Sequence, residues 1–224
     1  DLVGGDTTSS FTGMMMSITA VGEVDKKKIV YRSGAKEKNL ICVSGDLGGA
    51  YMGVQVLKRE KQIFKDAPEV QPELDNYQYV LGRQLKPEPR RDVIELLEKL
   101  EVQPTAMIDI SDGLSSELFH ICQKSDTGCL IYEDKIPIHE NTVATAEEMN
   151  IHPVTAALDG GEDYEMLFAV SLDDLDKVND VEGISIIGYI TEKSEGLRMQ
   201  TKQGELADLK ALGWKSFDID EKSE

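Results

Sequence analysis

The sequence predicts a mixed α+β fold. Short apolar runs typical of buried strands alternate with longer segments of helical spacing, and glycine or proline separates many of them. A length of 224 residues is enough to bury a sizeable core. The chain contains no internal repeat and no low-complexity tract, so we expect one α+β domain, or one domain and part of another.

The first predicted elements are two antiparallel strands. Residues 11–24 alternate loosely between apolar and polar, and residues 28–32 form a short β-branched run. The charged residues 25–27 would join the two strands, and Ser33-Gly34-Ala35 ends the pattern.

The rest of the chain mixes strands and helices. The apolar run at 40–43 predicts a buried strand that turns at Ser44-Gly45, and helical spacing follows from residue 47 to about 64. Gly128 is expected to end the helix that precedes it. We predict further helices at 73–84, 93–100, 114–122, 143–149 and 154–158, and further strands at 105–110, 129–132, 164–170, 184–190 and 197–201.

Composition excludes some classes of protein. A net charge of −18 repels nucleic-acid phosphates, whereas nucleotides stay compatible because magnesium can bridge carboxylates and phosphates. No run of eighteen apolar residues occurs, so no membrane span is predicted. The three cysteines have no C-x-x-C spacing, which fits reduced thiols in a cytoplasmic protein.

The first motif with ligand-binding chemistry is Val3-Gly4-Gly5-Asp6-Thr7-Thr8. Two adjacent glycines allow positive φ, so that backbone N–H groups can face an anion. The Asp6 carboxylate can hold a divalent cation, and the hydroxyls of residues 7–10 can reach phosphate oxygens. Because a strand should precede such a motif, we expect the chain to be the back part of a larger protein.

The strongest local motif is Asp109-Ile110-Ser111-Asp112. Alternation along the predicted strand places Asp109 opposite the apolar face, and Asp112 opens the next helix, where it could cap backbone amides. Both carboxylates would lie at the carboxyl end of a strand, where ligand sites tend to form. An ordinary N-cap explains Asp112 equally well, whereas an ionised Asp109 in an apolar strand needs a partner or a metal.

Three other segments are weaker candidates. In Gly160-Gly161-Glu162-Asp163-Tyr164-Glu165, acids join a glycine turn to an apolar strand, and spacing alone favours a solvated turn. Arg32 could clamp a phosphate, although a surface arginine is the commoner case. The aromatic residues of Leu212-Gly213-Trp214-Lys215-Ser216-Phe217 could stack on a ligand ring or pack in the core.

Taken together and in order, these motifs resemble one family. They are Val3-Gly4-Gly5-Asp6-Thr7-Thr8, Arg32-Ser33-Gly34-Ala35, the segment 108–114, the segment 160–165 and the segment 212–217. The chain is similar over essentially its whole length to the thiamine-monophosphate kinase family of the aminoimidazole-ribonucleotide-synthetase-like ATP-binding superfamily. The resemblance implies the C-terminal domain of that fold at 36–224 and the last strands of its N-terminal ATP-binding domain at 1–35.

The resemblance also implies an activity. The family transfers the γ-phosphoryl group of ATP directly to thiamine monophosphate, with Mg²⁺, in thiamine diphosphate biosynthesis. By resemblance, the contacts to ATP would come from Gly5, Asp6, Arg32 and Ser111. A homodimer is implied as well. Since the larger N-terminal part of the family lies outside these 224 residues, we expect them alone to be inactive.

By the same resemblance, Asp6, Asp109 and Asp112 would ligate Mg²⁺, and Glu162 and Phe217 would contact the thiamine substrate. The chemistry agrees, because the acceptor phosphate is already ionised and needs no general base. The obstacle is repulsion between anions, roughly 4 kcal/mol for one pair of unit charges about 4 Å apart at an effective dielectric near 20. Cations held by aspartates reduce that repulsion.

Two alternatives stay open at this point. The chain could belong to another ATP-dependent synthetase of the superfamily, acting on a purine precursor or on selenide, and a panel of substrates would separate these activities. It could also be a non-catalytic nucleotide-binding or dimerisation fragment, which calorimetry with ATP and magnesium would test.

Overall fold

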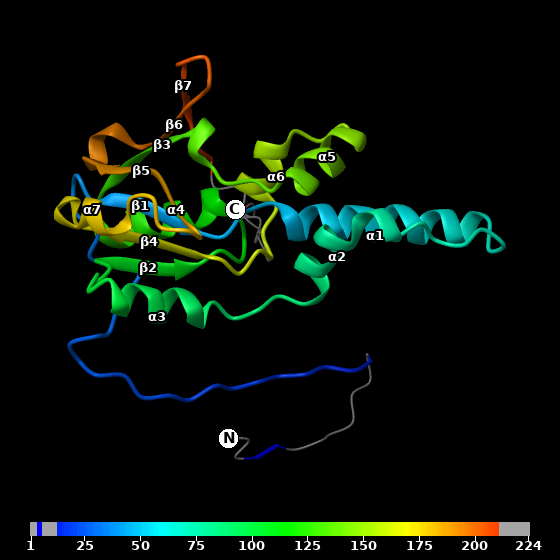
Figure 1. Cartoon of the computed structure of the whole chain (residues 1–224), viewed down its shortest axis with the longest axis horizontal. Coiled ribbons are helices and arrows are strands. Elements are labelled where there is room, and N and C mark those ends of the chain that lie inside the picture. Colours follow the sequence, from blue (N-terminus) through cyan, green and yellow to red (C-terminus); the bar gives the residue numbers. More distant parts are fainter. Residues whose placement is uncertain (1–3, 6–12, 211–224) are drawn as a thin grey trace, which may run out of the picture.

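A computed structural model describes residues 4–5 and 13–210. It confirms the predicted mixed fold: a seven-stranded sheet carries helices on both faces, and a helical arm projects from one end (Figure 1). Most predicted elements are present within a few residues of their expected bounds.

The sheet has the strand order β2-β4-β1-β5-β3-β6-β7. Neighbouring strands are antiparallel except β3 and β6, which are parallel. The strands are β1 (Leu40–Ser44), β2 (Ala106–Asp109), β3 (Gly128–Tyr132), β4 (Met166–Val170), β5 (Ile184–Thr191), β6 (Leu197–Gln200) and β7 (Leu206–Asp208).

Seven α-helices occur in the described part of the chain. They are α1 (Gly49–Asp66), α2 (Gln78–Leu85), α3 (Arg91–Lys99), α4 (Leu114–Ser125), α5 (Glu140–Glu148), α6 (Pro153–Asp159) and α7 (Leu175–Val178). Within these residues, no helix has both the length and the apolar character that crossing a bilayer requires.

Each face of the sheet has its own core, because strand side chains alternate between the two faces. On one face, α4 and α6 pack on strand residues that include Ile108 and Leu167. On the other face, α3 and α7 pack on strand residues that include Cys42 and Phe168. The sheet is therefore covered on both sides at β2, β4 and β1, and the ends of these strands are fixed in place.

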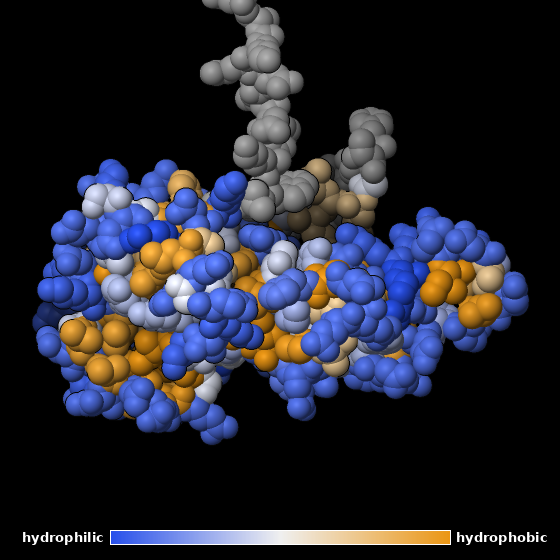
Figure 2. Space-filling view, turned by 90° about the horizontal axis from the view of Figure 1, so that it is seen from above, coloured by the Kyte–Doolittle hydropathy of each residue, from blue (hydrophilic) through white to orange (hydrophobic). Residues whose placement is uncertain are grey.

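The arm consists mainly of α1 and α2, which pack along each other (Figure 1). A third apolar cluster, which includes Met52, Val56 and Val80, joins the arm to α5 and α6. The arm ends in a partly exposed apolar tip that contains Ile63 and Phe64, visible as a patch at the right of Figure 2. At its other end, the arm meets the loops that follow β1.

The two strands expected before residue 33 do not form within the described residues 13–32. A strand needs a partner, and the apolar side chains of residues 14–16 are 78–89% exposed instead. The chain then runs beside β2 and α3, where Tyr31 O accepts a hydrogen bond from Met107 N at 3.0 Å and Lys28 Nζ lies 3.0 Å from Glu98 Oε1.

The predicted stop at Gly128 is also wrong. Helix α4 ends at Ser125, and Asp126 forms its cap with a φ of 57°, while Gly128 is already the first residue of β3. Aspartate is one of the few non-glycine residues that adopt this left-handed conformation readily.

Candidate functional site

The two acidic motifs lie side by side in the structure. Ile110 N donates to Glu165 O at 2.7 Å, and Tyr164 N donates to Ile110 O at 2.8 Å. Glu162 N donates to Ser111 O at 2.7 Å. These three bonds extend the pairing of β2 with β4 beyond the strand ends and join residues 109–112 to residues 160–165.

Glycine permits this close approach. A Cβ on Gly161 would lie 2.5 Å from Ser111 O, and one on Gly113 would lie 2.5 Å from Leu158 O. Both glycines also have positive φ, 68° and 110°. A side chain at Gly161 would push the two motifs apart, and one at Gly113 would collide with the end of α6.

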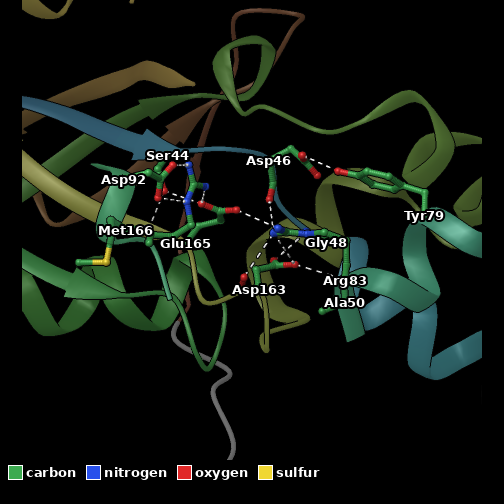
Figure 3. A network of polar contacts seen from close by, with 11 residues as sticks. Ser44, Asp46, Gly48, Ala50, Tyr79, Arg83, Asp92, Asp163, Glu165 and Met166 are labelled. Carbon is green, nitrogen blue, oxygen red and sulfur yellow. Dashed lines mark hydrogen bonds and ion pairs between the residues drawn. The ribbon is translucent and has the colours of Figure 1, made fainter. Parts of the chain in front are cut away.

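Side chains of the 162–165 segment alternate between two environments. Glu162 and Tyr164 lie on the outer side, exposed and half-buried respectively. Asp163 and Glu165 point inward and are only 3% and 1% exposed. The favoured interpretation of this motif as a solvated turn is therefore wrong for two of its three acids, Asp163 and Glu165, because they are the anions of a buried polar network (Figure 3).

The Glu165 carboxylate is held by two arginines and a serine. Arg83 Nη1 donates to Glu165 Oε1 at 2.9 Å, and Arg90 Nη1 donates to Glu165 Oε2. Ser44 Oγ donates to Glu165 Oε2 at 2.5 Å and accepts from Met166 N at 2.8 Å. Since a buried carboxylate is tolerated only when it is paired and hydrogen-bonded, this arrangement fixes the start of β4.

Asp163 caps the first turn of α1. Its Oδ2 accepts from Gly48 N at 2.7 Å and its Oδ1 accepts from Ala50 N at 3.2 Å. Arg83 Nη2 donates to Asp163 O at 3.3 Å, so the guanidinium lies between Asp163 and Glu165 (Figure 3). Burial raises the pKa of Asp163 to about 6, although the two backbone N–H groups and Arg83 favour the charged form.

On the outer side, carboxylates gather around the end of β2. Asp109 and Asp112 are exposed. The pKa of the nearby Tyr164 is raised by its hydrogen bond to Glu162 and by burial, and the charges of Asp109 and Asp112 add to this increase. Beneath them, Glu117 is buried, and its Oε1 accepts from Asp112 N at 3.2 Å. The pKa of Glu117 is raised to about 7, mainly by burial; the charges of Asp112 and Asp109 contribute to the increase, and hydrogen bonds from backbone N–H groups oppose it.

Two predictions about these aspartates need correction. Asp112 does not cap α4: the N-cap is Gly113, and no side chain bonds the first turn there. The backbone of Asp112 is instead held by Glu117, which sequence reasoning missed. Asp109 is exposed, so its charge carries no burial penalty and does not by itself require a metal.

For the other predicted site residues, the structure gives less information about a role in binding. Ser111 lies between the two aspartates, and its carbonyl binds the Glu162 amide. Gly5 is exposed, and a Cβ there would meet no atom within 4 Å. Arg32 is exposed and follows Tyr31, which bonds β2 at Met107 rather than at the strand end. Asp6 and Phe217 lie outside the described residues.

Sequence reasoning did not find the inward acids or their arginines. One available signal was the position of Glu165, which directly precedes the apolar run Met166–Val170 in the alternation of a buried strand. Arg83 and Arg90 gave no such signal, because they are 82 and 75 positions away from Glu165.

Fold and site together define an acidic edge on a mixed sheet covered on both faces, and the fold has known relatives. Residues 36–200 match the family described as AIR synthase related protein, C-terminal domain, and the chain belongs to this family. The matched region extends through β6 and includes both acidic motifs.

Among curated proteins, the chain is similar to thiamine-monophosphate kinases. It is 31% identical to that of Bacillus subtilis (strain 168), over 87% of this chain and 58% of the relative. It is 33% identical to that of Escherichia coli (strain K12), over 97% of this chain and 62% of the relative. The chain therefore spans about three fifths of the length of these relatives.

Among solved structures, the chain is similar to AaThiL complexed with AMPPCP and TMP. The TM-score is 0.67 at 29% sequence identity, and the match covers 84% of this chain and 54% of that chain.

Proposed function

We propose that the full gene product is a thiamine-monophosphate kinase, which transfers the γ-phosphoryl group of ATP to thiamine monophosphate. The observation that carries this proposal is the junction of the 109–112 and 160–165 motifs into one acidic edge. The similarity to thiamine-monophosphate kinases and to a structure complexed with AMPPCP and TMP supports it.

We infer the roles of individual residues from the resemblance. Asp109 and Asp112 would bind Mg²⁺, Ser111 would contact ATP, and Glu162 would contact thiamine monophosphate. The proximity of these side chains around the end of β2 supports the assignment. The proposed roles of Gly5, Asp6, Arg32 and Phe217 rest on the resemblance alone.

The donor set fits magnesium. Carboxylate oxygens are the ligands it prefers, and it commonly binds through one or two of them together with water and substrate phosphates. In the described part of the chain, no three side chains of His, Cys, Asp or Glu form a complete metal site. Asp109 and Asp112 would therefore hold the ion together with phosphate oxygens. When bound, it would neutralise charge on the transferring phosphoryl group.

The residues of this chain would mainly bind and orient. The acceptor phosphate is ionised at neutral pH, so no side chain has to remove a proton. His120, His139 and His152 have no role in this scheme. The close contact at Gly161 holds the 160–165 segment, with the proposed substrate contact Glu162, against the 109–112 segment, with the proposed contacts to Mg²⁺ and ATP. In-line transfer depends on such positioning.

We further propose that residues 1–35 are the last part of an N-terminal ATP-binding domain and that 36–224 form the C-terminal domain. We also propose that the protein is a cytoplasmic homodimer. The family match that begins at residue 36 supports the boundary. The free, buried Cys42, Cys122 and Cys129 fit a reducing compartment. The unpaired apolar segment 13–24 supports pairing with other chain segments.

The test is formation of thiamine diphosphate by the full gene product from thiamine monophosphate, ATP and Mg²⁺. Asp109→Asn should lower kcat about 10²–10³-fold, because a charge that stabilises the transition state is lost. The control Asp176→Asn changes an exposed aspartate on α7 and should have no effect. Turnover of a purine precursor or of selenide in place of thiamine monophosphate would contradict the proposal.

A further inference from the structure

The outer side of the 160–165 segment contains one hydrogen bond that the proposed roles do not explain. Tyr164 Oη donates to Glu162 Oε2 at 3.0 Å. The two residues are two positions apart and lie on the same side of the segment, with Asp163 pointing inward between them. The hydroxyl thus binds the carboxylate that is proposed to meet the substrate.

The backbone at this point adopts uncommon conformations. Glu162 and Tyr164 have φ of 63° and 52°, a region that side chains other than glycine, asparagine and aspartate rarely adopt. Such a conformation is strained and persists only where its surroundings hold it in place. Here both backbone N–H groups are bound to the carbonyls of Ser111 and Ile110.

The inward side chains provide a second restraint. Asp163 is bound to the first turn of α1, and Glu165 is bound by Arg83 and Arg90. Fixed in this way at its inward positions, the segment cannot turn to let Glu162 and Tyr164 separate. Their hydrogen bond therefore forms from preorganised backbone positions, and only the χ angles of Glu162 and Tyr164 are left to be fixed.

We propose that Tyr164 is a positioning residue for Glu162, whose hydroxyl sets the orientation of the carboxylate that receives the substrate. This inference rests on the proposed function. A free glutamate samples several rotamers, and fixing it before binding removes part of the entropic cost of binding. One carboxylate oxygen is occupied by Tyr164, and the other is left to accept a hydrogen bond from the ligand.

The test uses the full gene product and steady-state kinetics. Tyr164→Phe removes only the hydroxyl and should raise KM for thiamine monophosphate about 5- to 10-fold, while KM for ATP and kcat change less than about twofold. Glu162→Gln should raise the same KM at least about 10-fold. With Ala at position 162, the additional Tyr164→Phe change should add less than about twofold, because the carboxylate that the hydroxyl would position is already absent.

Tyr189→Phe is the matched control, since this tyrosine lies on β5 and should leave all constants unchanged. If Tyr164→Phe behaves like this control in an active enzyme, the positioning role is wrong. Equal effects of Tyr164→Phe with Glu and with Ala at position 162 would also contradict it, because the hydroxyl would then act independently of Glu162.

The proposed function fails in a different way, through a wild-type protein that does not form thiamine diphosphate. In that case, calorimetric titration of the same variants with thiamine monophosphate decides the inference. If Tyr164→Phe weakens binding only when Glu162 is present, the inference is supported. Unchanged binding in this variant, or no binding by any of the proteins, overturns it.

Discussion

Asp163 combines two properties that rarely occur together in one residue. It is almost completely buried, and its carboxylate caps α1 through Gly48 N and Ala50 N. Burial raises its pKa from 3.8 to about 6 in the folded protein. Between these two values, the folded state binds the proton more tightly than the unfolded state does.

A pH dependence of stability follows. The contribution of Asp163 to the free energy of unfolding should be largest below about pH 4 and should be lost as the pH rises through about 6. Asp163→Asn removes this titration. The stability advantage of the wild type over this variant should therefore shrink by about 1–3 kcal/mol between pH 4 and pH 7.

Urea unfolding at a series of pH values measures this difference. Asp176→Asn serves as the control, because this exposed aspartate should show a constant difference from the wild type. A difference for Asp163→Asn that does not change with pH would mean that Asp163 titrates alike in the folded and unfolded states.

At the scale of elements, the site depends on how closely the 160–165 segment approaches the end of β2. Gly161→Ala would place a methyl group 2.5 Å from Ser111 O, whereas Gly196→Ala would meet no atom within 4 Å. Both glycines have a positive φ, 68° and 70°, so both substitutions strain the backbone.

We therefore predict different costs for the two variants. Gly196→Ala should lower the free energy of unfolding by about 1–3 kcal/mol, because its φ of 70° and ψ of −161° lie in a region that is essentially restricted to glycine. Gly161→Ala should cost a further 1–3 kcal/mol or so, because the two backbones must separate. Denaturant unfolding of both proteins measures the gap, and equal costs would show that the two motifs can separate freely.

The helical arm formed by α1 and α2 also supports the candidate site. The N-terminus of α1 is bound by Asp163, and Arg83 of α2 is bound to Glu165. Both helices of the arm are thus connected to the segment that carries Glu162. A change in the arm that displaced Arg83 would leave Glu165 with one arginine fewer, and would reach the candidate site through β4.

At the scale of the whole molecule, residues 13–24 stand apart. Their apolar side chains, among them Ile18 at 90% and Val21 at 93%, are exposed, and they form no strand. In the described part of the chain they add little to the cores on either face of the sheet. Exposed apolar surface of this kind promotes association.

We predict that a chain shortened to residues 25–224 unfolds at nearly the same temperature as the 224-residue chain and associates less. Thermal unfolding followed by circular dichroism measures the first quantity, and light scattering measures the second. A large fall in the unfolding temperature would contradict the prediction, since it would require contacts between residues 1–24 and the domain.

Local pattern was enough to predict much of this fold. Alternation and helical spacing located β1, β2 and α4 because neighbouring residues alone decide these features. The two acidic motifs were found for the same reason. The strands expected at 11–24 and 28–32 failed because pairing depends on a partner strand, which a single segment does not reveal.

The sequence by itself determined the fold class, the acidic residues at the end of β2, and the glycines that make room for a close contact. Only the tertiary structure decided that Asp163 and Glu165 are buried anions while Glu162 and Tyr164 face outward. The physical reason is that the cost of burying a charge depends on its partners. Arg83, Arg90 and the first turn of α1 come from distant parts of the chain and meet these acids only when it folds.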